Sequence, residues 1–452
     1  MLKFNRLLLA ALMAGLVSMA SANFIAVEAE RVNPLRLQLD AYTNQLLGVV
    51  EDQQGLVPIQ VLQIELGKII RSVPAIEQLI AAEERLKAQL QNAESGYFPQ
   101  VSVNAGKGYR DNKMDSDGDV ESLTLSLQQL IYDFGSLDAS VDSTKMANDA
   151  IRANIAVQRS EVFLDLIAAQ LNLAKEEQLF LLSEVFVDSR QRFADYIQER
   201  LSLGSASNAD LTRARSQVLA AKGRLPDVMS RLEEARNDYI ELYGVAPKSG
   251  NWFNITDIIN PEVMEIDIVQ HPSFVNADLS HQSAISKLSS IEKGRWGKVT
   301  GDLGLTRSSL PGQADSKYSE ASINYSAMLY TGGAQEAQIA EAQTAVVEAQ
   351  YEVERVKRNL QATTSSTMFT FTQKMEGLSI KVQSLKAARE ATQSVQNLFT
   401  YGRSSMTDVI SAQRDELDAA TELVESFSDY QLSYFELLHQ THNLLKLIDK
   451  PI

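Results

Sequence analysis

The sequence predicts a mainly α-helical protein with a β-barrel part, built from two structural repeats. Three observations carry this prediction: two very long helical stretches, a duplication along the chain, and pairs of short segments with alternating polarity. The long stretches, residues 136–203 and 334–401, lack proline, and each runs from one glycine to another over the same interval. A helix of that length is about 100 Å long, whereas helices in globular proteins average about a dozen residues. Such helices must lie against long neighbours, because they cannot fold back to cover themselves.

The first long stretch carries apolar residues at steps of three, four or seven positions, as in the narrow seam of a coiled coil. These residues are Ile155, Val162, Leu166, Ala169, Leu173, Phe180 and Val187. We therefore expect one narrow contact seam, with polar residues on the other faces of the helix.

The composition excludes several classes of partner and site. The chain has 452 residues, a formal charge of −16 and a pI near 4.9. This acidity argues against nucleic acid and anionic membrane surfaces as partners. The absence of cysteine excludes structural disulfides, cysteine-bound metals and a lipid-modified N-terminal cysteine. No nucleophile elbow, phosphate loop or zinc signature is present, so the residues predict no enzyme activity and no cofactor.

Residues 1–22 have the features of a secretory signal peptide. Lys3 and Arg6 supply the basic region, residues 7–17 the apolar region, and residues 20–22 (Ala-Ser-Ala) the cleavage site. No other run of about twenty apolar residues occurs, which excludes a helical membrane protein. We therefore expect an exported protein.

An internal duplication covers most of the chain. A constant shift of 198 residues carries Pro74 to Pro272 and Tyr132 to Tyr330 without a gap. The other matching pairs are Gly96 and Gly294, Val101 and Val299, Gly106 and Gly304, Gly135 and Gly333, Gly204 and Gly402, Ser207 and Ser405, Asp210 and Asp408, and Ala214 and Ala412. Matched glycines and prolines over such a span indicate that one structural unit occurs twice.

The duplication sets the expected boundaries. Repeat 1 covers residues 74–243 and repeat 2 covers residues 272–447, each with a helix, a β-hairpin, a long helix and a returning helix. Residues 23–73 form an N-terminal segment, residues 244–271 a linker and residues 448–452 a tail. The two short helices stacked against each long helix meet about halfway along it. We therefore expect the N-terminal segment and the linker to gather there, at the equator of the helical part.

Each repeat carries two segments with alternating polarity, of the length of a tilted transmembrane strand. They lie at residues 101–109 and 123–128 in repeat 1, and at 299–306 and 323–329 in repeat 2. An ordinary soluble hairpin with core aromatics is the alternative for any one of them. Four strands cannot close a barrel, and a bilayer tolerates no open strand edge, so several copies must combine their hairpins.

Glycines and aromatic residues mark the places where helices meet strands. The helices before the hairpins, 75–95 and 273–293, are followed by Gly96 and Gly294, which suit the left-handed position after a helix. Aromatic rings lie near the strand ends, as at the bilayer interfaces of barrel proteins. The predicted aromatic girdle consists of Tyr97, Phe98, Tyr132, Phe134, Trp296 and Tyr330.

Each long helix ends in a turn that leads into a returning helix, predicted at residues 208–243 and 406–447. A serine and an aspartate three positions later start each returning helix, which is the spacing of a capping box. The pairs are Ser207 with Asp210 and Ser405 with Asp408. Capping alone accounts for these residue types. Short helices stacked against the long ones would form a hollow cylinder coaxial with the barrel.

Three motifs complete the pattern: Tyr-Asp-Phe-Gly at 132–135, Tyr-Thr-Gly-Gly at 330–333, and the tip sequence at 402–413. Together with the duplication, they resemble the TolC family of outer-membrane efflux and secretion channels. The resemblance implies a homotrimer whose twelve-stranded outer-membrane β-barrel, with four strands per chain, is continuous with a long periplasmic α-helical barrel. It places residues 23–73 in the periplasm, at the equator.

The resemblance also implies partners. Channels of this family dock a periplasmic adaptor (membrane fusion protein) and an inner-membrane ABC or other transporter. They serve either type I protein secretion or small-molecule efflux. The missing acylated cysteine favours type I secretion, with multidrug efflux as the alternative. The expected location is the outer membrane, in contact with its lipid, with a large periplasmic part and no nucleic acid partner.

The resemblance places the gate and the adaptor-docking surface at the helical tip, at Gly204, Ser207, Asp210, Gly402, Arg403, Ser405 and Asp408. It implies that Asp408 lines the lumen in a cation-favouring ring. It also implies that Asp210 joins the contacts that hold neighbouring helices shut. The sequence departs from the best-known member at Ser411, Ser404 and Phe399, where a second acidic ring, a latch arginine and a latch tyrosine stand in that member.

Two further groups have simpler interpretations. The acidic residues of 115–121 hint at calcium, but the position of Gly118 does not match an EF-hand loop, and a solvated turn is expected. His439 and His442 lie three positions apart on the predicted returning helix without a further ligand, so no metal site is predicted. Two other protein classes stay open: a periplasmic coiled-coil adaptor, and a filament or surface-layer structural protein.

Overall fold

A computed structural model of the chain describes residues 38–69, 73–110, 118–255, 267–310 and 314–448. The predicted signal peptide (1–22) and residues 115–117 of the acidic turn lie outside the described residues.

The chain divides into two units, each of which draws on both halves of the sequence. Unit 1 comprises the described residues of Met1–Pro74, Ser160–Met264 and Thr364–Ile452. Unit 2 comprises those of Ala75–Arg159 and Glu265–Thr363. The two units therefore do not coincide with the two sequence repeats, because each long helix contributes to both units.

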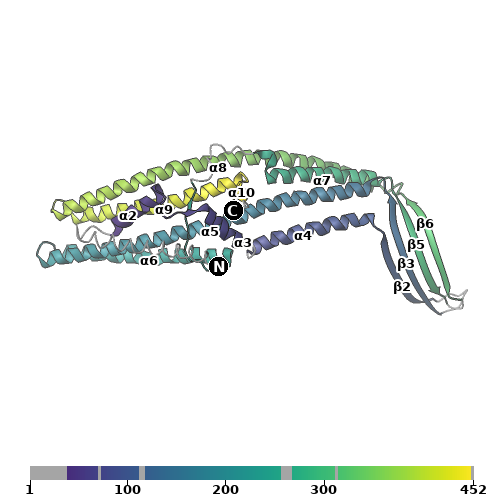
Figure 1. Ribbon diagram of the computed structural model, residues 1–452, viewed down its shortest axis with the longest axis horizontal. Coiled ribbons are helices and arrows are strands. Elements are labelled where there is room, and N and C mark those ends of the chain that lie inside the picture. The colour runs from purple at the N-terminus through teal and green to yellow at the C-terminus, as the bar shows by residue number, and fades with distance from the viewer. Residues whose placement is uncertain (1–37, 70–72, 111–117, 256–266, 311–313, 449–452) are drawn as a thin grey trace, which may run out of the picture. The chain divides into compact units, whose positions relative to one another are not determined.

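Unit 2 contains a four-stranded antiparallel sheet (Figure 1). Its strands, in hydrogen-bonded order, are β2 (Gln100–Arg110), β3 (Gly118–Tyr132), β5 (Lys298–Ser309) and β6 (Ser316–Ser326). Both predicted hairpins are therefore present. One prediction is wrong: residues 327–329 were expected to continue β6 but follow its end. Ser326 pairs with Lys298, the first residue of β5, so no backbone partner is available beyond it.

The two faces of the sheet differ in polarity, as the alternating sequence predicts. Leu125 lies opposite Val103 on one side and Leu305 on the other, and these side chains form an exposed apolar face. On the opposite face, the carboxylate of Asp302 accepts a hydrogen bond of 2.8 Å from Gln128 on the neighbouring strand. The sheet therefore has one apolar face and one hydrogen-bonded polar face.

In unit 2, the helix that begins at Ser136 and the helix that ends at Gly294 pack through small side chains. Ser136 and Ser290 exchange hydrogen bonds of 2.9 Å between hydroxyl and backbone carbonyl, and Ser143 and Ser283 repeat this contact. Small side chains at these positions let the two helices approach closely. Helices α4 (Pro74–Glu94), α7 (Pro272–Gly294) and the first part of α5 (Ser136–Ser202) lie side by side in Figure 1. The serine contacts join α5 and α7, and residues 334–363 of the second long helix also belong to this unit.

The glycines at the ends of α4 and α7 do not adopt the predicted left-handed conformation. Gly96 lies in a 3₁₀ turn, η1 (Ser95–Tyr97), Gly294 is the last residue of α7, and neither has a positive φ. A Cβ atom on Gly96 would lie 2.9 Å from a methyl carbon of Leu137, and one on Gly294 would lie 3.2 Å from Ser136 Oγ. The left-handed prediction was therefore wrong, and these glycines make room for the start of α5.

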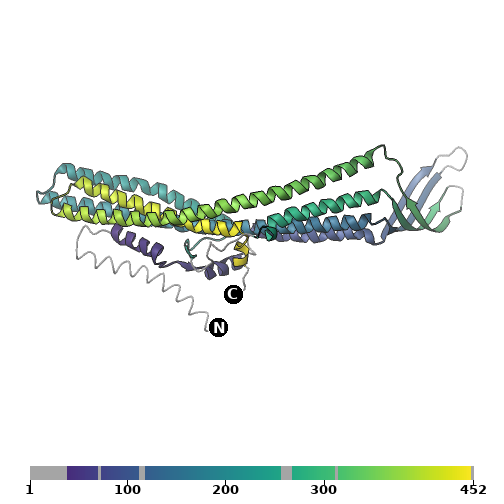
Figure 2. The same cartoon turned by 90° about the horizontal axis from the view of Figure 1, so that it is seen from above.

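Unit 1 holds the rest of the long helices and most short elements. Helices α5 and α8 (Ala334–Thr400) each have 67 residues, which confirms the two predicted long helices to within one residue. Their returning helices are α6 (Asn208–Tyr243) and α9 (Met406–Gln440), and Figure 2 shows the four side by side in this unit. The short elements of the chain are α2 (Gln38–Glu51), β1 (Val57–Pro58), α3 (Ile59–Ile69), β4 (Phe253–Asn254), η3 (Ile268–Gln270) and α10 (Leu444–Ile448).

The burial of α5 in unit 1 is wider than the predicted seam. Leu166 and Leu173 of the seam are buried, but so are Ile167 and Leu171, which point in other directions around the helix. Helices α6, α9 and α2 each donate a hydrogen bond to α5 in this region. The narrow-seam prediction is therefore wrong here, because α5 has neighbours on several sides.

Helix α9 ends at Gln440, before the predicted limit at residue 447. The backbone leaves the helix through His442, whose φ is 56°, before α10 begins. His439 and His442 therefore do not share a helical face, and His439 Nδ1 instead lies 2.8 Å from Ser160 Oγ. Among the described residues, none of the helices has the length and apolar character needed to cross a membrane.

Candidate functional site

The first tip turn joins α5 to α6. Gly204 has a φ of 74°, and the N–H of Ser205 donates to the carbonyl of Arg200 at 2.8 Å, which closes the end of α5. Ser207 caps α6: its hydroxyl accepts from the N–H of Asp210 at 3.1 Å, and Asp210 Oδ2 accepts from the N–H of Ser207 at 3.0 Å. The predicted capping box is confirmed. The hydrogen bonds from Ser207 lower the pKa of Asp210 below its usual value.

The second tip turn joins α8 to α9 with the same geometry. Gly402 has a φ of 69°, and Ser405 and Asp408 form the second predicted capping box. Asp408 Oδ2 accepts from the N–H of Ser405 at 2.9 Å and from the hydroxyl of Ser404 at 3.0 Å. The backbone hydrogen bond from Ser405, and then the hydroxyls of Ser405 and Ser404, lower the pKa of Asp408. Both tips therefore carry an ionised carboxylate, which is exposed at Asp408 and partly exposed at Asp210.

The two tip hairpins touch through side chains that lie far apart in the sequence. Arg213 Nη1 on α6 donates to Thr407 Oγ1 on α9 at 3.0 Å. The guanidinium of Arg200 lies 5.2 Å from the ring centre of Phe399, which is itself buried 5.8 Å from Phe193. Phe399 is therefore part of the tip core. No sequence pattern marked these contacts, because they join residues far apart in the chain.

The junction between β3 and α5 is fixed by the predicted motif at residues 132–135. Phe134 and Gly135 have φ values of 60° and 80°, which turn the chain sharply from strand to helix. The carboxylate of Asp133 accepts hydrogen bonds from the N–H groups of Gly135 and Leu137, so it caps α5. The rings of Tyr132 and Phe134 lie 4.9 Å apart.

The predicted girdle residues lie at the strand–helix junctions of unit 2, and their rings are exposed. Trp296, with 58% of its surface exposed, follows α7, and Arg295 lies 5.4 Å above its ring. Tyr325 Oη donates to the carbonyl of Trp296 at 2.8 Å, which fixes the chain before β5. The exposed girdle residues are Tyr97, Phe98, Tyr132, Phe134, Trp296 and Tyr330.

The sequence model of the family described as outer membrane efflux protein matches residues 66–245 and again residues 267–438, well over half of the chain. The chain belongs to the outer membrane efflux protein family. Proteins of this family are channels of the TolC type in the outer membrane, with a large periplasmic part, and the family consists of channels, not enzymes. TolC-type channels are trimeric and work with adaptors and inner-membrane transporters.

Curated relatives of this efflux-protein chain match over most of their length. The outer membrane efflux protein BepC of Brucella suis is 20% identical over 401 residues, which cover 83% of this chain and 84% of BepC. The outer membrane protein TolC of Escherichia coli is 19% identical over 390 residues, which cover 81% of this chain and 79% of TolC.

Solved structures share the fold of this member of the outer membrane efflux protein family. CusC superposes with a TM-score of 0.74 at 14% identity, covering 86% of this chain and 93% of CusC. The outer membrane protein VceC of Vibrio cholerae superposes with a TM-score of 0.72 at 14% identity, covering 84% of this chain and 96% of VceC. The predicted α-helical barrel component with a β part is thereby confirmed as a TolC-type fold.

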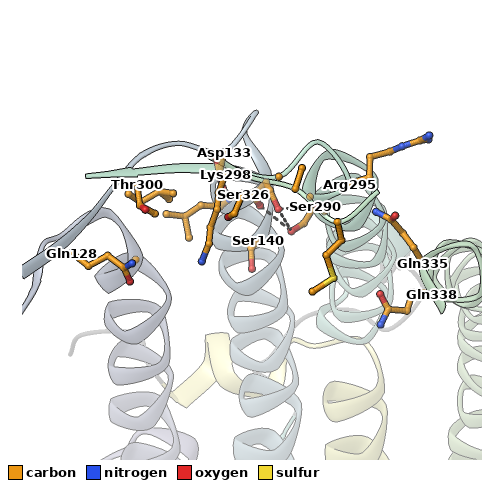
Figure 3. Close-up of a pocket in the computed structure, with 18 of the residues that line it drawn as sticks. Gln128, Asp133, Ser140, Ser290, Arg295, Lys298, Thr300, Ser326, Gln335 and Gln338 are labelled. Atoms are coloured by element: carbon orange, nitrogen blue, oxygen red, sulfur yellow. Dashed lines mark hydrogen bonds between the residues drawn. The ribbon is translucent and has the colours of Figure 1, made fainter. Parts of the chain in front are cut away.

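A cavity of about 1030 Å³ lies within unit 2, where the strands meet the helices (Figure 3). Lys298 lines it, together with serines of α5 and α7 such as Ser140 and Ser290. Among the described residues, no group of three His, Cys, Asp or Glu side chains is placed to hold a metal ion. The lining therefore mixes hydroxyl, amide and charged groups with apolar side chains such as Phe98, Leu137 and Met328.

Proposed function

We propose that this chain is the outer-membrane channel of a type I protein secretion system. It would receive its substrate from an inner-membrane ABC transporter through a periplasmic adaptor. The absence of cysteine in the whole sequence supports secretion, because the acylated drug-efflux branch of the family needs an N-terminal cysteine for its lipid. The proposed docking surface is the tip, with Gly204, Ser207, Asp210, Gly402, Arg403, Ser405 and Asp408.

The observation that carries the channel itself is the two-faced sheet with two edge strands. Strands β2 and β6 lie at the ends of the hydrogen-bonded order, and the apolar face with Leu125 and Leu305 is exposed. In a bilayer, such edges must pair, and closed membrane barrels need about eight strands or more. Three copies would supply twelve strands, so we propose a homotrimer. Native mass measurement in detergent tests this, and a stable monomer would contradict it.

Small-molecule efflux is the second candidate function. The family description and the name of the Brucella relative both refer to efflux. Deletion of the gene separates the two candidates. Loss of a secreted protein from the medium with unchanged drug sensitivity would support type I secretion, whereas increased drug sensitivity with normal secretion would support efflux.

Trp296→Asp should reduce trimer in the outer membrane several-fold while leaving helix content almost unchanged. An exposed charge at the predicted bilayer interface opposes membrane insertion, where aromatic rings are favoured. Quantitative blotting of membrane trimer and circular dichroism measure the two effects. Tyr351→Asp, at an exposed aromatic on α8, is the matched control and should assemble normally. Equal yields of the two variants would show that Trp296 does not mark the interface.

Asp408→Asn should reduce the cation preference of the channel in planar bilayers. Three Asp408 carboxylates around a narrow axis would attract cations and exclude anions. Hydrogen bonds from Ser405 and Ser404 lower the pKa of Asp408, which opposes the rise that repulsion among the three carboxylates would cause. Asp408 should therefore stay ionised at neutral pH, and the preference should be lost on acidification. Asp210→Asn removes the matching carboxylate of the other capping box and should leave selectivity unchanged. If both variants keep the wild-type selectivity, Asp408 is only a cap.

A further inference from the structure

Helix α2 (Gln38–Glu51) is hydrogen-bonded to three long helices of unit 1. Tyr42 Oη donates to the carbonyl and the side-chain Oε1 of Gln178 on α5, at 3.1 and 2.7 Å. Thr43 Oγ1 donates to Glu416 Oε1 on α9 at 3.0 Å. On α8, Arg389 Nε donates to the carboxylate of Asp40 in α2. A single short helix therefore connects α5 with the α8–α9 hairpin.

The contacts with α8 are charged and close to water. Asp40 accepts from Arg389 Nε and from Gln393 Nε2, and Lys386 forms an ion pair of 2.6 Å with Glu51. The side chains of Asp40 and Arg389 are each 24% exposed, and those of Lys386 and Glu51 are more exposed. The more exposed pair of Lys386 and Glu51 contributes little to stability, because water solvates both charges once they separate. This side of α2 can therefore be released at low cost.

The contact of α2 with α9 contains the buried carboxylate of Glu416, which favours the release of α2 from α9. Glu416 is 1% exposed, and burial is the largest cause of its raised pKa, with Asp40 adding to the rise and Thr43, Thr392 and Arg389 opposing it. Burial of an ionised carboxylate is unfavourable. Separation of α2 from α9 would let water reach Glu416. The docked state is thus favoured as the pH falls through this raised pKa and disfavoured as the pH rises above it.

The contact with α5 is of a different kind. Tyr42 is uncharged, makes two hydrogen bonds with Gln178, and has a pKa raised by burial. Separation of α2 from α5 would expose no buried charge to water, so it would gain no hydration energy. The contact of Tyr42 with α5 therefore does not favour release, unlike the contact of α2 with Glu416.

We propose that α2 is a releasable strap that holds the α8–α9 hairpin against α5 and limits the opening of the channel. Release takes place at the contacts of Asp40, Thr43 and Glu51, while Tyr42 stays on α5. Any widening that separates the hairpin from α5 must break their direct contacts, such as that of Arg190 with Gln413, and one of these two sets of α2 contacts as well. Of the two sets, the charged one is the weaker. The proposal rests on the proposed function, since it requires a gated channel.

Asp40→Ala should increase the fraction of open channels about fivefold, since one partly buried ion pair and its hydrogen bonds are lost. Glu416→Gln should act in the opposite direction, because a neutral amide removes the cost of burying the carboxylate. Conductance of purified wild-type and variant channels in planar bilayers measures both. Glu422→Ala is the matched control: it breaks an exposed ion pair of 2.8 Å with Lys381 inside the α8–α9 hairpin, so it should leave the conductance unchanged.

Two further variants keep the result independent of folding defects. Exchanging the charges, with Asp40→Arg and Arg389→Asp together, should restore the wild-type conductance. Cysteines at Glu51 and Lys386 can be joined by a short reducible cross-linker, since the chain has no other cysteine. Cross-linking should lower the open fraction, and reduction should restore it.

The outcomes distinguish a failure of the strap proposal from a failure of the proposed channel function. Unchanged conductance in Asp40→Ala, or a cross-linked channel that opens normally, would overturn the strap and leave the channel intact. A wild-type protein that conducts no ions in the bilayer would instead contradict the proposed function. If Asp40→Ala fails to assemble, the cross-linked protein decides the question alone.

Discussion

Gly297→Ala should remove most of the assembled channel from the outer membrane. Gly297 lies between α7 and β5 with a φ of 82°, a conformation that side chains with a Cβ rarely adopt. A Cβ atom there would lie 2.2 Å from the backbone oxygen of Ser326 and 2.8 Å from Ala327 Cβ. Strain and clash together should cost roughly 3 kcal/mol or more, because the backbone at the end of β6 cannot move without disturbing its pairing with Lys298.

The measurement is the amount of heat-resistant trimer in isolated outer membranes. Gly304→Ala, in the strand β5 that follows Gly297, is the control, since a Cβ at Gly304 meets nothing within 4 Å and its φ is not positive. That variant should assemble at the wild-type level. Equal assembly of both variants would mean that the backbone at Gly297 tolerates a different turn from the one described.

Features that depend on neighbours in the sequence could be predicted from it. The absence of proline and the glycines at each end delimited α5 and α8, because a helix continues until a residue with left-handed φ ends it. The boxes at Ser207 and Ser405 could be predicted as well, since both partners lie within one turn. Alternating polarity gave the strands because one sheet face is apolar and the other polar.

Features that depend on contacts between distant segments could not be predicted. Gly96 and Gly294 look like helix-terminating glycines, yet their role is to admit Leu137 and Ser136. Thr43 and its acceptor Glu416 are 373 positions apart, and no spacing rule connects them. The wide burial of α5 likewise results from three neighbouring helices, whereas a heptad pattern predicts a single contact face towards one neighbouring helix.

Arg190→Met combined with Gln413→Leu should raise the thermal stability of the folded channel. Arg190 is 2% exposed, and its guanidinium donates to Gln413 Oε1 at 2.8 Å and to the carbonyl of Ile410 at 2.9 Å. It also lies 4.7 Å from the ring centre of Phe186. All of these partners are uncharged. Buried arginines in proteins are usually paired with an acid, so this charge is unusual.

The local electrostatics oppose the charge. Burial, and then the neighbouring Arg224 and Arg414, lower the pKa of Arg190 to about 10. Gln413 Nε2 is also buried, without a hydrogen-bond partner among the described residues. Replacing buried charged groups by apolar side chains of similar volume is often stabilising by about 1–4 kcal/mol. Both substitutions are needed, because Arg190→Met alone leaves Gln413 Oε1 unsatisfied in the core.

Thermal denaturation followed by circular dichroism measures the change on the purified, assembled protein. Arg190→Ala should instead destabilise, since it leaves a cavity as well as the unpaired amide. Arg192→Met, two positions away on the same helix, replaces a partly exposed arginine paired with Asp188 at 2.8 Å, and should shift the stability by no more than about 0.5 kcal/mol. A loss of stability in the double variant would mean that the hydrogen bonds of Arg190 outweigh the cost of burying its charge.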